Sequence, residues 1–125
     1  MKAITIQQPW AWAIMSGGKD IENRVWSTSY RGPLLIHAGV AYRSDAVMPR
    51  GVQAPDKQDL TFGAILGVVD LVDVVEKSRS RWFEGDYGSV LRNPRMLSRP
   101  VPCKGQLRLW NPTAAQLRLV RERLT

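Results

Sequence analysis

The chain has 125 residues, of which 44% are hydrophobic, so we expect one globular domain over residues 1–125 rather than a disordered chain. No apolar run approaches the roughly 20 residues that a helix needs to cross a bilayer, which argues against a membrane protein. One cysteine and one histidine exclude an internal disulfide and a structural zinc site. The first residues lack the long apolar segment of a secretory signal, which indicates a cytoplasmic protein.

The formal net charge of +7 is concentrated in the C-terminal half of the chain. Residues 1–60 carry seven basic and five acidic side chains, and residues 61–76 carry three acidic ones only. Residues 77–99 carry six basic and two acidic side chains, and residues 100–125 carry five basic and one acidic. Such an excess favours a polyanionic partner, nucleic acid first, although many small basic proteins have no specific ligand.

The N-terminal elements follow from periodicity and from the prolines and glycines between them. Residues 2–7 alternate and carry β-branched side chains, which predicts a first strand. Pro9 suits the first turn of a short helix over residues 9–16, which Gly17 or Gly18 would end. A second strand is expected over about residues 20–26.

The stretch from residue 17 to residue 26, Gly-Gly-Lys-Asp-Ile-Glu-Asn-Arg-Val-Trp, is the most informative for function. Side chains two apart in a strand share a face, so Glu22, Arg24 and Trp26 would point the same way. Lys19 would lie just before the strand. A carboxylate, a guanidinium and an indole on one face suit a planar polar ligand such as a nucleobase. The alternative is a solvated barrel strand with a Glu–Arg pair and one core tryptophan.

A turn-rich segment, residues 27–32, precedes a mostly apolar run over residues 33–38 that predicts a buried strand. His37 lies near the end of this strand. It is either a satisfied, partly buried histidine or a neutral donor or acceptor that lines a pocket beside Lys19 and Glu22.

Residues 39–61 show no sustained periodicity and predict a long loop with at most a short helical turn. Loops of this length are often functional or mobile, so we interpret this one as a lid or edge of the site. Tyr42 and Arg43 are its most usable side chains.

The valine-rich run over residues 62–76 is the strongest strand signal in the chain. Gly63 and Gly67 interrupt it, and glycine inside a strand often marks a bend where a sheet curls into a barrel. We interpret its acidic residues as solvated positions rather than as metal ligands: Asp70, Asp73 and Glu76.

Residues 77–86 are charged and irregular, with Trp82 and Phe83 between Arg79 and Arg81 on one side and Glu84 and Asp86 on the other. Basic residues interleaved with aromatic ones suit single-stranded nucleic acid, because bases stack on the rings while arginines meet phosphates.

The C-terminal third predicts a strand over residues 87–92, a turn region with three prolines over residues 93–102 and a last strand over residues 104–110. Asn111 then resembles the N-cap of a final helix over residues 112–124. Five to six short strands with an early and a terminal helix predict a mainly β, α+β fold, a small closed or nearly closed β-barrel.

Several motifs, taken in order, resemble the ASCH (activating signal cointegrator homology) domain family over about residues 2–110. The motifs are Gln8-Pro9-Trp10-Ala11, Gly18-Lys19 with Glu22, Arg24 and Trp26, Tyr30-Arg31-Gly32-Pro33 with Ile36-His37-Ala38, Gly63-Ala64-Ile65 with Gly67-Val68-Val69, Tyr87-Gly88, and Gly105-Gln106-Leu107 with Leu109-Trp110.

The resemblance implies a PUA-like β-barrel, related to domains that bind RNA in pseudouridine synthases. It implies a cleft lined by the Gly-x-Lys-x-x-Glu-x-Arg segment, with RNA or a modified nucleotide as ligand and no cofactor. Some small bacterial members look like amidohydrolases that remove an acyl group from N4-acetylcytidine, and others are known as ribonucleases. We therefore expect ligand contacts from Gln8, Trp10, Arg24, Trp26, Tyr30, Arg31, Trp82 and Tyr87.

The catalytic residues of the amidohydrolase branch carry over only in part. Its lysine matches Lys19, but its threonine three residues later is Glu22 here, so a covalent step of the threonine type is excluded. The distant acidic partner of that branch has no clear match, and Asp70 and Asp73 are unanchored.

Three functions stay open, and the sequence does not decide between an enzyme and a binding module. A nucleic-acid or modified-nucleotide binding module needs only the aromatic and basic residues. An N4-acylcytosine amidohydrolase would use Lys19 to stabilise the oxyanion or act as a base, Glu22 to activate water, and His37 to assist. A ribonuclease would use Lys19 or Arg24 on the phosphorane and Glu22 or His37 for the protons.

Overall fold

The structure, a computed structural model, describes residues 1–124. The sheet in this part of the chain has six strands, and two α-helices and a 3-10 turn accompany it. The elements are β1 (Lys2–Gln8), α1 (Trp10–Ser16), β2 (Ile21–Arg24), β3 (Gly32–Tyr42), η1 (Lys57–Asp59), β4 (Ala64–Val75), β5 (Tyr87–Pro102), β6 (Leu109–Trp110) and α2 (Ala114–Arg123).

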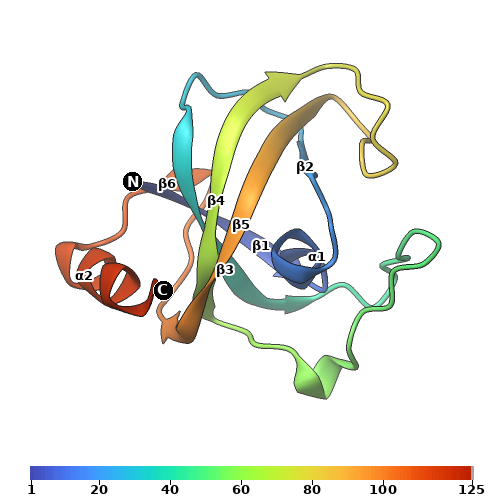
Figure 1. Cartoon of the computed structure of the whole chain (residues 1–125). Helices are drawn as coiled ribbons and strands as arrows, with labels where there is room; N and C mark the ends of the chain where they lie inside the picture. The colour runs from blue at the N-terminus through green and yellow to red at the C-terminus, as the bar shows by residue number, and fades with distance from the viewer. Residues whose placement is uncertain (125) are drawn as a thin grey trace.

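The strands form one sheet in the order β2-β5-β4-β3-β1-β6, in which β1 runs parallel to β3 and the other neighbours are antiparallel. The sheet curls into a half-barrel (Figure 1). The curl brings β2, at one edge of the sheet, close to β1, which lies next to the other edge strand β6. Arg24 Nη2 on β2 donates to the backbone oxygen of Thr5 on β1 at 3.0 Å. The predicted mainly β fold with an early and a terminal helix is confirmed.

Gly67 lies where the sheet bends, as its position inside a predicted strand indicated. A Cβ at this position would lie 2.4 Å from the backbone oxygen of Arg95 and 2.4 Å from Met15 Cε. The pairing between β4 and β5 shifts register between Ile65 and Gly67. Glycine therefore lets β5 and α1 approach β4 where the sheet bends.

Two apolar cores lie on opposite faces of the sheet. The first fills the curl, where Ile14 of α1 packs against Leu34 and Ile36. The second lies beneath α2, where fully buried Val120 packs with Leu35. Leu35 belongs to β3 but points to the opposite face of the sheet from Leu34 and Ile36. The predicted apolar stripe of the terminal helix, Leu117, Val120 and Leu124, contributes to this second core.

Residues 93–102 were expected to form a turn region, and this expectation is wrong because they continue β5. Strand β2 pairs with β5 only from Tyr87 to Val90, so the later part of β5 lies at the sheet edge on that side. Proline is tolerated in an edge strand because its missing N–H removes no ladder hydrogen bond there. Asn93, at φ 56, marks an irregular point in the strand.

The expected bounds also change elsewhere in the C-terminal part. The last strand is only Leu109–Trp110, and residues 104–108 form a loop. The N-cap of α2 is Thr113 rather than Asn111, because Thr113 and Gln116 form a capping box. Strand β3 continues to Tyr42, which shortens the long loop that was expected to begin at residue 39.

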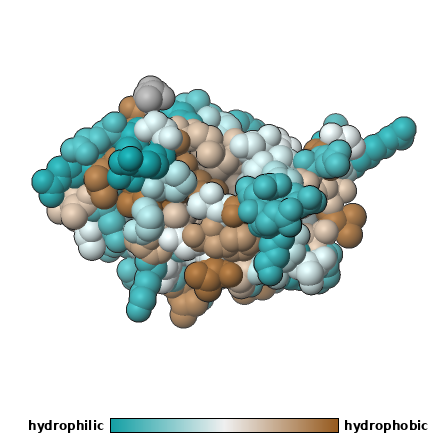
Figure 2. Space-filling view, turned by 90° about the horizontal axis from the view of Figure 1, so that it is seen from below, coloured by the Kyte–Doolittle hydropathy of each residue, from teal (hydrophilic) through white to brown (hydrophobic). Residues whose placement is uncertain are grey.

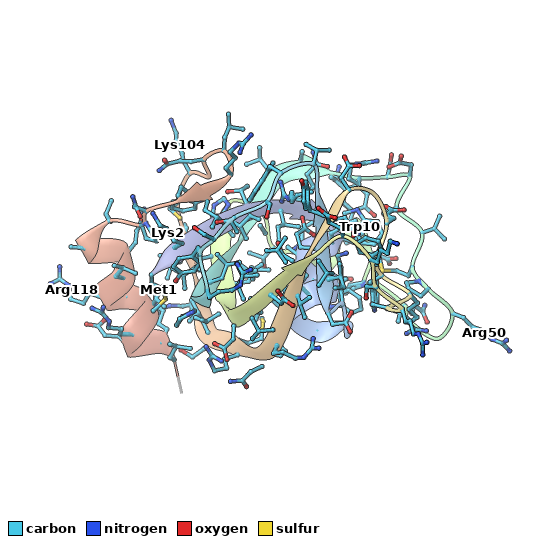
Figure 3. All side chains as sticks on the ribbon, turned by 90° about the horizontal axis from the view of Figure 1, so that it is seen from above. Met1, Lys2, Trp10, Arg50, Lys104 and Arg118 are labelled. Atoms are coloured by element: carbon cyan, nitrogen blue, oxygen red, sulfur yellow. The ribbon has the colours of Figure 1, made fainter. Side chains whose placement is uncertain are left out.

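Two loops lie on the side of the half-barrel that carries α1 (Figure 1). They cover residues 43–53 and 77–86, and Arg81 Nη1 joins them by donating to the backbone oxygen of Arg50 at 2.9 Å. Arg50 projects at the end of the molecule remote from Arg118 of α2 (Figure 3). Seen from below, hydrophilic and apolar groups are interspersed over the surface (Figure 2). None of the helices within residues 1–124 has the length and apolar character needed to span a bilayer.

Candidate functional site

A cavity of about 550 Å³ lies at the open seam of the half-barrel. Strand β6 pairs with β1 only at Ala3 and Ile4, so β1 from Thr5 onward has no strand neighbour on that side within residues 1–124. This free edge and strand β2 form facing walls of the cavity. Its lining also includes α1 and four loops. The lining residues are Thr5, Ile6, Gln7, Trp10, Lys19, Glu22, Asn23, Arg24, Arg43, Val47, Pro49, Arg81, Trp82, Phe83, Glu84, Gln106, Leu107 and Arg108.

A compact group of charges forms the floor of the cavity. Both Nε and Nη2 of Arg24 lie 2.9 Å from Glu22 Oε2. The other carboxylate oxygen of Glu22 lies 4.0 Å from Lys19 Nζ, which is beyond hydrogen-bonding distance. The side chains of Lys19 and Glu22 are only 5% and 11% exposed. Their charges are therefore paired but largely withdrawn from water.

Two tryptophans enclose the lysine. Lys19 Nζ lies 5.3 Å from the ring centroid of Trp10 and 5.5 Å from that of Trp82, within the range of cation–π attraction. The two rings meet edge to face with centroids 6.5 Å apart. Burial lowers the pKa of Lys19 below its ordinary value, although the nearby carboxylate of Glu22 partly opposes this shift. The lysine can therefore release a proton more readily than an exposed lysine.

Exposed arginines stand at the mouth of the cavity. Arg43 follows β3 and Arg108 precedes β6, far apart in the sequence, and Arg81 precedes Trp82. Together with Lys19 and Arg24 they place five cationic side chains in the lining against two acidic ones, Glu22 and Glu84. A cavity with this excess of positive charge attracts anionic ligands.

Trp26 lies next to the cavity rather than in its lining. The guanidinium carbon of Arg24 lies 5.8 Å from its ring centroid, and that of Arg108 lies 5.4 Å from it. The ring thereby connects the end of β2 to the loop before β6. Arg24 contacts both Glu22 and Trp26, but β2 ends at Arg24, so Trp26 lies beyond the strand that was expected to extend to about residue 26.

The cavity brings together five of the predicted site residues: Trp10, Lys19, Glu22, Arg24 and Trp82. Gln8 is buried elsewhere, where its amide donates to the backbone oxygen of Thr61 and accepts from the backbone N–H of Trp12. Tyr30 and Arg31 contact nearby backbone oxygens, and Arg31 lies 3.7 Å from Asp73. Tyr87 pairs with Arg24 across the strands but does not line the cavity.

The expectation that His37 lines a pocket beside Lys19 is wrong. His37 is 1% exposed and lies under the loop before β6, with Nε2 2.8 Å from the backbone oxygen of Cys103 and its ring 5.7 Å from Trp110. Burial lowers the pKa of His37. His37 alternates with Ile36 along β3 and therefore faces the α2 side of the sheet.

Neither acidic residue of β4 that was considered for the site reaches the cavity. Asp70 accepts hydrogen bonds from Arg95, which keep the pKa of its carboxyl group below the usual value. Asp73, near the end of β4, lies 3.7 Å from Arg31.

Sequence reasoning did not identify several lining residues. Asn23 fixes the 77–86 loop, since its side chain donates to the backbone oxygen of Trp82 and accepts from the backbone N–H of Glu84. Gln106, Leu107 and Arg108 were expected in a strand. Asn23 could have been predicted as a site residue because it lies between Glu22 and Arg24 in the sequence. No local sequence pattern indicated that the loop residues Gln106, Leu107 and Arg108 line the cavity.

Comparisons with known proteins agree on one family. The family model described as the ASCH domain matches residues 4–93. The chain is similar to activating signal cointegrator 1 of Homo sapiens and of Mus musculus, each 27% identical over 124 residues that cover 86% of this chain. The same residues make up 21% of either relative, so the chain spans about a fifth of their length.

Solved structures agree in fold. A crystal structure of ASCH from Zymomonas mobilis has a TM-score of 0.59 and 16% identity, and the match covers 99% of this chain and 95% of that one. A mutant of the same Zymomonas mobilis protein gives a TM-score of 0.60, with 16% identity and coverage of 99% and 98%.

Proposed function

The chain belongs to the ASCH domain family, as its motifs predicted, and we propose that it binds RNA or a modified nucleotide in the cavity at the seam of the half-barrel. The observation that carries the proposal is the charged group in the cavity, made of buried Lys19, buried Glu22 and half-buried Arg24, in which Lys19 lies within 5.5 Å of two tryptophan rings. Three exposed arginines also line the cavity. We further propose that residues 1–125 act as one domain.

The charged floor suits the polar edge of a base. Lys19 and Arg24 supply donors, and Glu22 Oε1 is an acceptor that Lys19 approaches only to 4.0 Å. A base with an exocyclic amino group can donate to this oxygen while its ring acceptors receive hydrogen bonds from the cations. The indole rings of Trp10 and Trp82 add an apolar wall against which a base can pack.

The arginines at the mouth suit the phosphates that accompany a base. Arg43 and Arg108 are exposed, and Arg81 is exposed beside Trp82. Contacts of arginine with phosphate release counterions, so they provide affinity that depends on salt but not on sequence.

Titration of the protein with short single-stranded RNA tests the proposal, with tryptophan fluorescence as the signal because two indoles line the cavity. We expect the affinity to fall with salt, and each lost phosphate contact to reduce the slope of log K against log salt by about 0.7. Arg43→Ala and Arg108→Ala should each reduce this slope.

Arg118→Ala is the matched control, because Arg118 is exposed on α2, remote from the Arg50 end of the molecule (Figure 3). Equal losses in Arg118→Ala and Arg43→Ala would mean that binding is spread over the surface, and the cavity would not be the site.

A second candidate function is hydrolysis of N4-acetylcytidine, which is supported by the largely buried side chains of Lys19 and Glu22, a cation and a carboxylate 4.0 Å apart in the cavity. In this reaction Glu22 takes a proton from water, the hydroxide adds to the acyl carbonyl, and Lys19 stabilises the oxyanion. The C–N bond then breaks, the amine leaves with the proton, and acetate and cytidine are released.

Chromatography of N4-acetylcytidine incubated with the wild type, Lys19→Ala and Glu22→Gln tests this candidate. Conversion to cytidine by the wild type that disappears in both variants would support hydrolysis, and no conversion by the wild type over hours would leave binding as the function. Loss of full-length RNA on a gel would instead indicate a ribonuclease.

A further inference from the structure

Leu107 stands out at the mouth of the cavity because it is apolar, 91% exposed and part of the lining. Val47, 81% exposed, lines the same cavity from the 43–53 loop. Both residues lie near exposed arginines in sequence, Leu107 next to Arg108 and Val47 four residues after Arg43. An isolated exposed leucine is common, but one held at the entrance of a charged cavity calls for a physical account.

The loop of residues 104–108 holds Leu107 outward by contacts on both sides. Before it, Gly105 packs so closely on β1 that a Cβ there would lie 2.4 Å from Thr5 Oγ1. After it, Arg108 has φ 55, an unfavourable backbone conformation for a residue other than glycine, and its guanidinium carbon lies 5.4 Å from the ring centroid of Trp26. Leu107 is therefore presented to solvent by a fixed loop.

The depth of the charged floor limits which form of ligand can reach it. Counted over the whole residue, side chain and backbone together, Lys19 is 6% exposed and Glu22 is 8% exposed, so both lie below the surface. A base stacked between its neighbours in a strand cannot reach these groups unless its nucleotide turns out of the stack. Proteins that extract a base in this way have a pocket that receives it, and apolar side chains can enter between the bases that remain.

We propose that Leu107 is a wedge that enters a stacked RNA strand beside the nucleotide whose base occupies the cavity. The ligand is then a nucleotide within a strand rather than a free nucleoside, with neighbouring phosphates at Arg43 and Arg108. This inference rests on the proposed function, since it requires a base in the cavity.

The test compares two ligands, a 12-nucleotide RNA in which cytidine alternates with 2-aminopurine nucleotides, and cytidine 5′-monophosphate. The fluorescence of 2-aminopurine increases when the base loses a stacked neighbour. We expect the wild type to bind both ligands and to brighten the RNA. In Leu107→Ala, RNA affinity should fall about tenfold, since burial of a leucine side chain contributes on this scale, and the brightening should disappear. Binding of the monophosphate should not change.

Val40→Ala is the matched control, because Val40 is 85% exposed and lies outside the cavity lining. It should behave as the wild type toward both ligands. If Leu107→Ala binds and brightens the RNA as the wild type does, or weakens both ligands equally, the wedge is overturned while the proposed function stands. If the wild type binds neither ligand, the proposed function fails and the wedge fails with it.

Discussion

Replacement of Lys19 by methionine separates the role of this residue in ligand binding from its role in stability. The lysine lies 4.0 Å from Glu22, and the interaction of two unit charges at that distance is about 4 kcal/mol at an effective dielectric constant of 20. The pKa of Lys19 is nevertheless lowered, with burial as the largest cause, so the charged form is less favourable here than in water.

Methionine removes the charge, keeps a flexible side chain of similar length between the indoles, and leaves Glu22 paired with Arg24 at 2.9 Å. We therefore expect Lys19→Met to have a free energy of unfolding at pH 7 that equals that of the wild type or exceeds it by up to about 2 kcal/mol, within the range found when whole buried ion pairs are replaced by apolar groups. Binding of RNA or nucleotide should be lost.

The difference should also depend on pH with a definite sign. Because the pKa of Lys19 is lower in the folded protein than its ordinary value of 10.5, the unfolded chain binds the extra proton. The penalty is full below the folded pKa and disappears as pH rises through that value toward 10.5. The advantage of Lys19→Met should therefore be larger at pH 7 than at pH 10.

Guanidinium denaturation at both pH values, followed by tryptophan fluorescence, measures these differences. Lys77→Met, at an exposed lysine, is the control and should show neither effect. A loss of more than about 1 kcal/mol in Lys19→Met at pH 7 would refute the reasoning, because the lysine would then stabilise the fold despite its burial.

Glu22→Gln leaves Lys19 and Arg24 without their counter-ion, so urea denaturation should show a loss of about 1–3 kcal/mol, below the value for a fully buried pair because Arg24 is partly exposed; an unchanged midpoint would contradict this. The pKa of His37 is lowered by burial, so wild-type stability should fall as pH decreases below about 6.5, and a flatter profile in His37→Gln would assign the effect. Thr113→Ala removes the N-cap of α2 and should reduce stability by about 1 kcal/mol in thermal denaturation, without affecting ligand binding.

The part of the site that the sequence could predict lies within one short stretch. Lys19, Glu22 and Arg24 are close in sequence, and the period of a strand is enough to place the last two on one face. The same period, applied to β3, places His37 opposite Ile36 and therefore away from the curl of the sheet. The expectation for His37 was wrong because it was based on the chemistry of histidine and did not take into account the alternation of side chains along β3.

The remainder of the site depends on tertiary closure. Arg43 and Arg108 are 65 positions apart in the sequence and meet at one cavity only because β1 lies between β3 and β6 in the sheet. No local pattern determines that order. The predicted strand was also shorter than β5, because the three prolines in residues 93–102 predict a turn unless it is known that they lie in a strand at the sheet edge.

The free edge of β1 has a consequence for how the protein behaves in concentrated solution. An uncovered strand edge presents backbone groups that can pair with a strand of another molecule, and natural proteins often protect such edges with charged side chains. Here Arg24 already donates a hydrogen bond to the backbone oxygen of Thr5, and charged and aromatic side chains line the cavity beside it. The charged groups that we propose to bind the ligand therefore also protect the seam against self-association, and we expect a substitution that removes charge from the cavity to lower solubility as well as ligand binding.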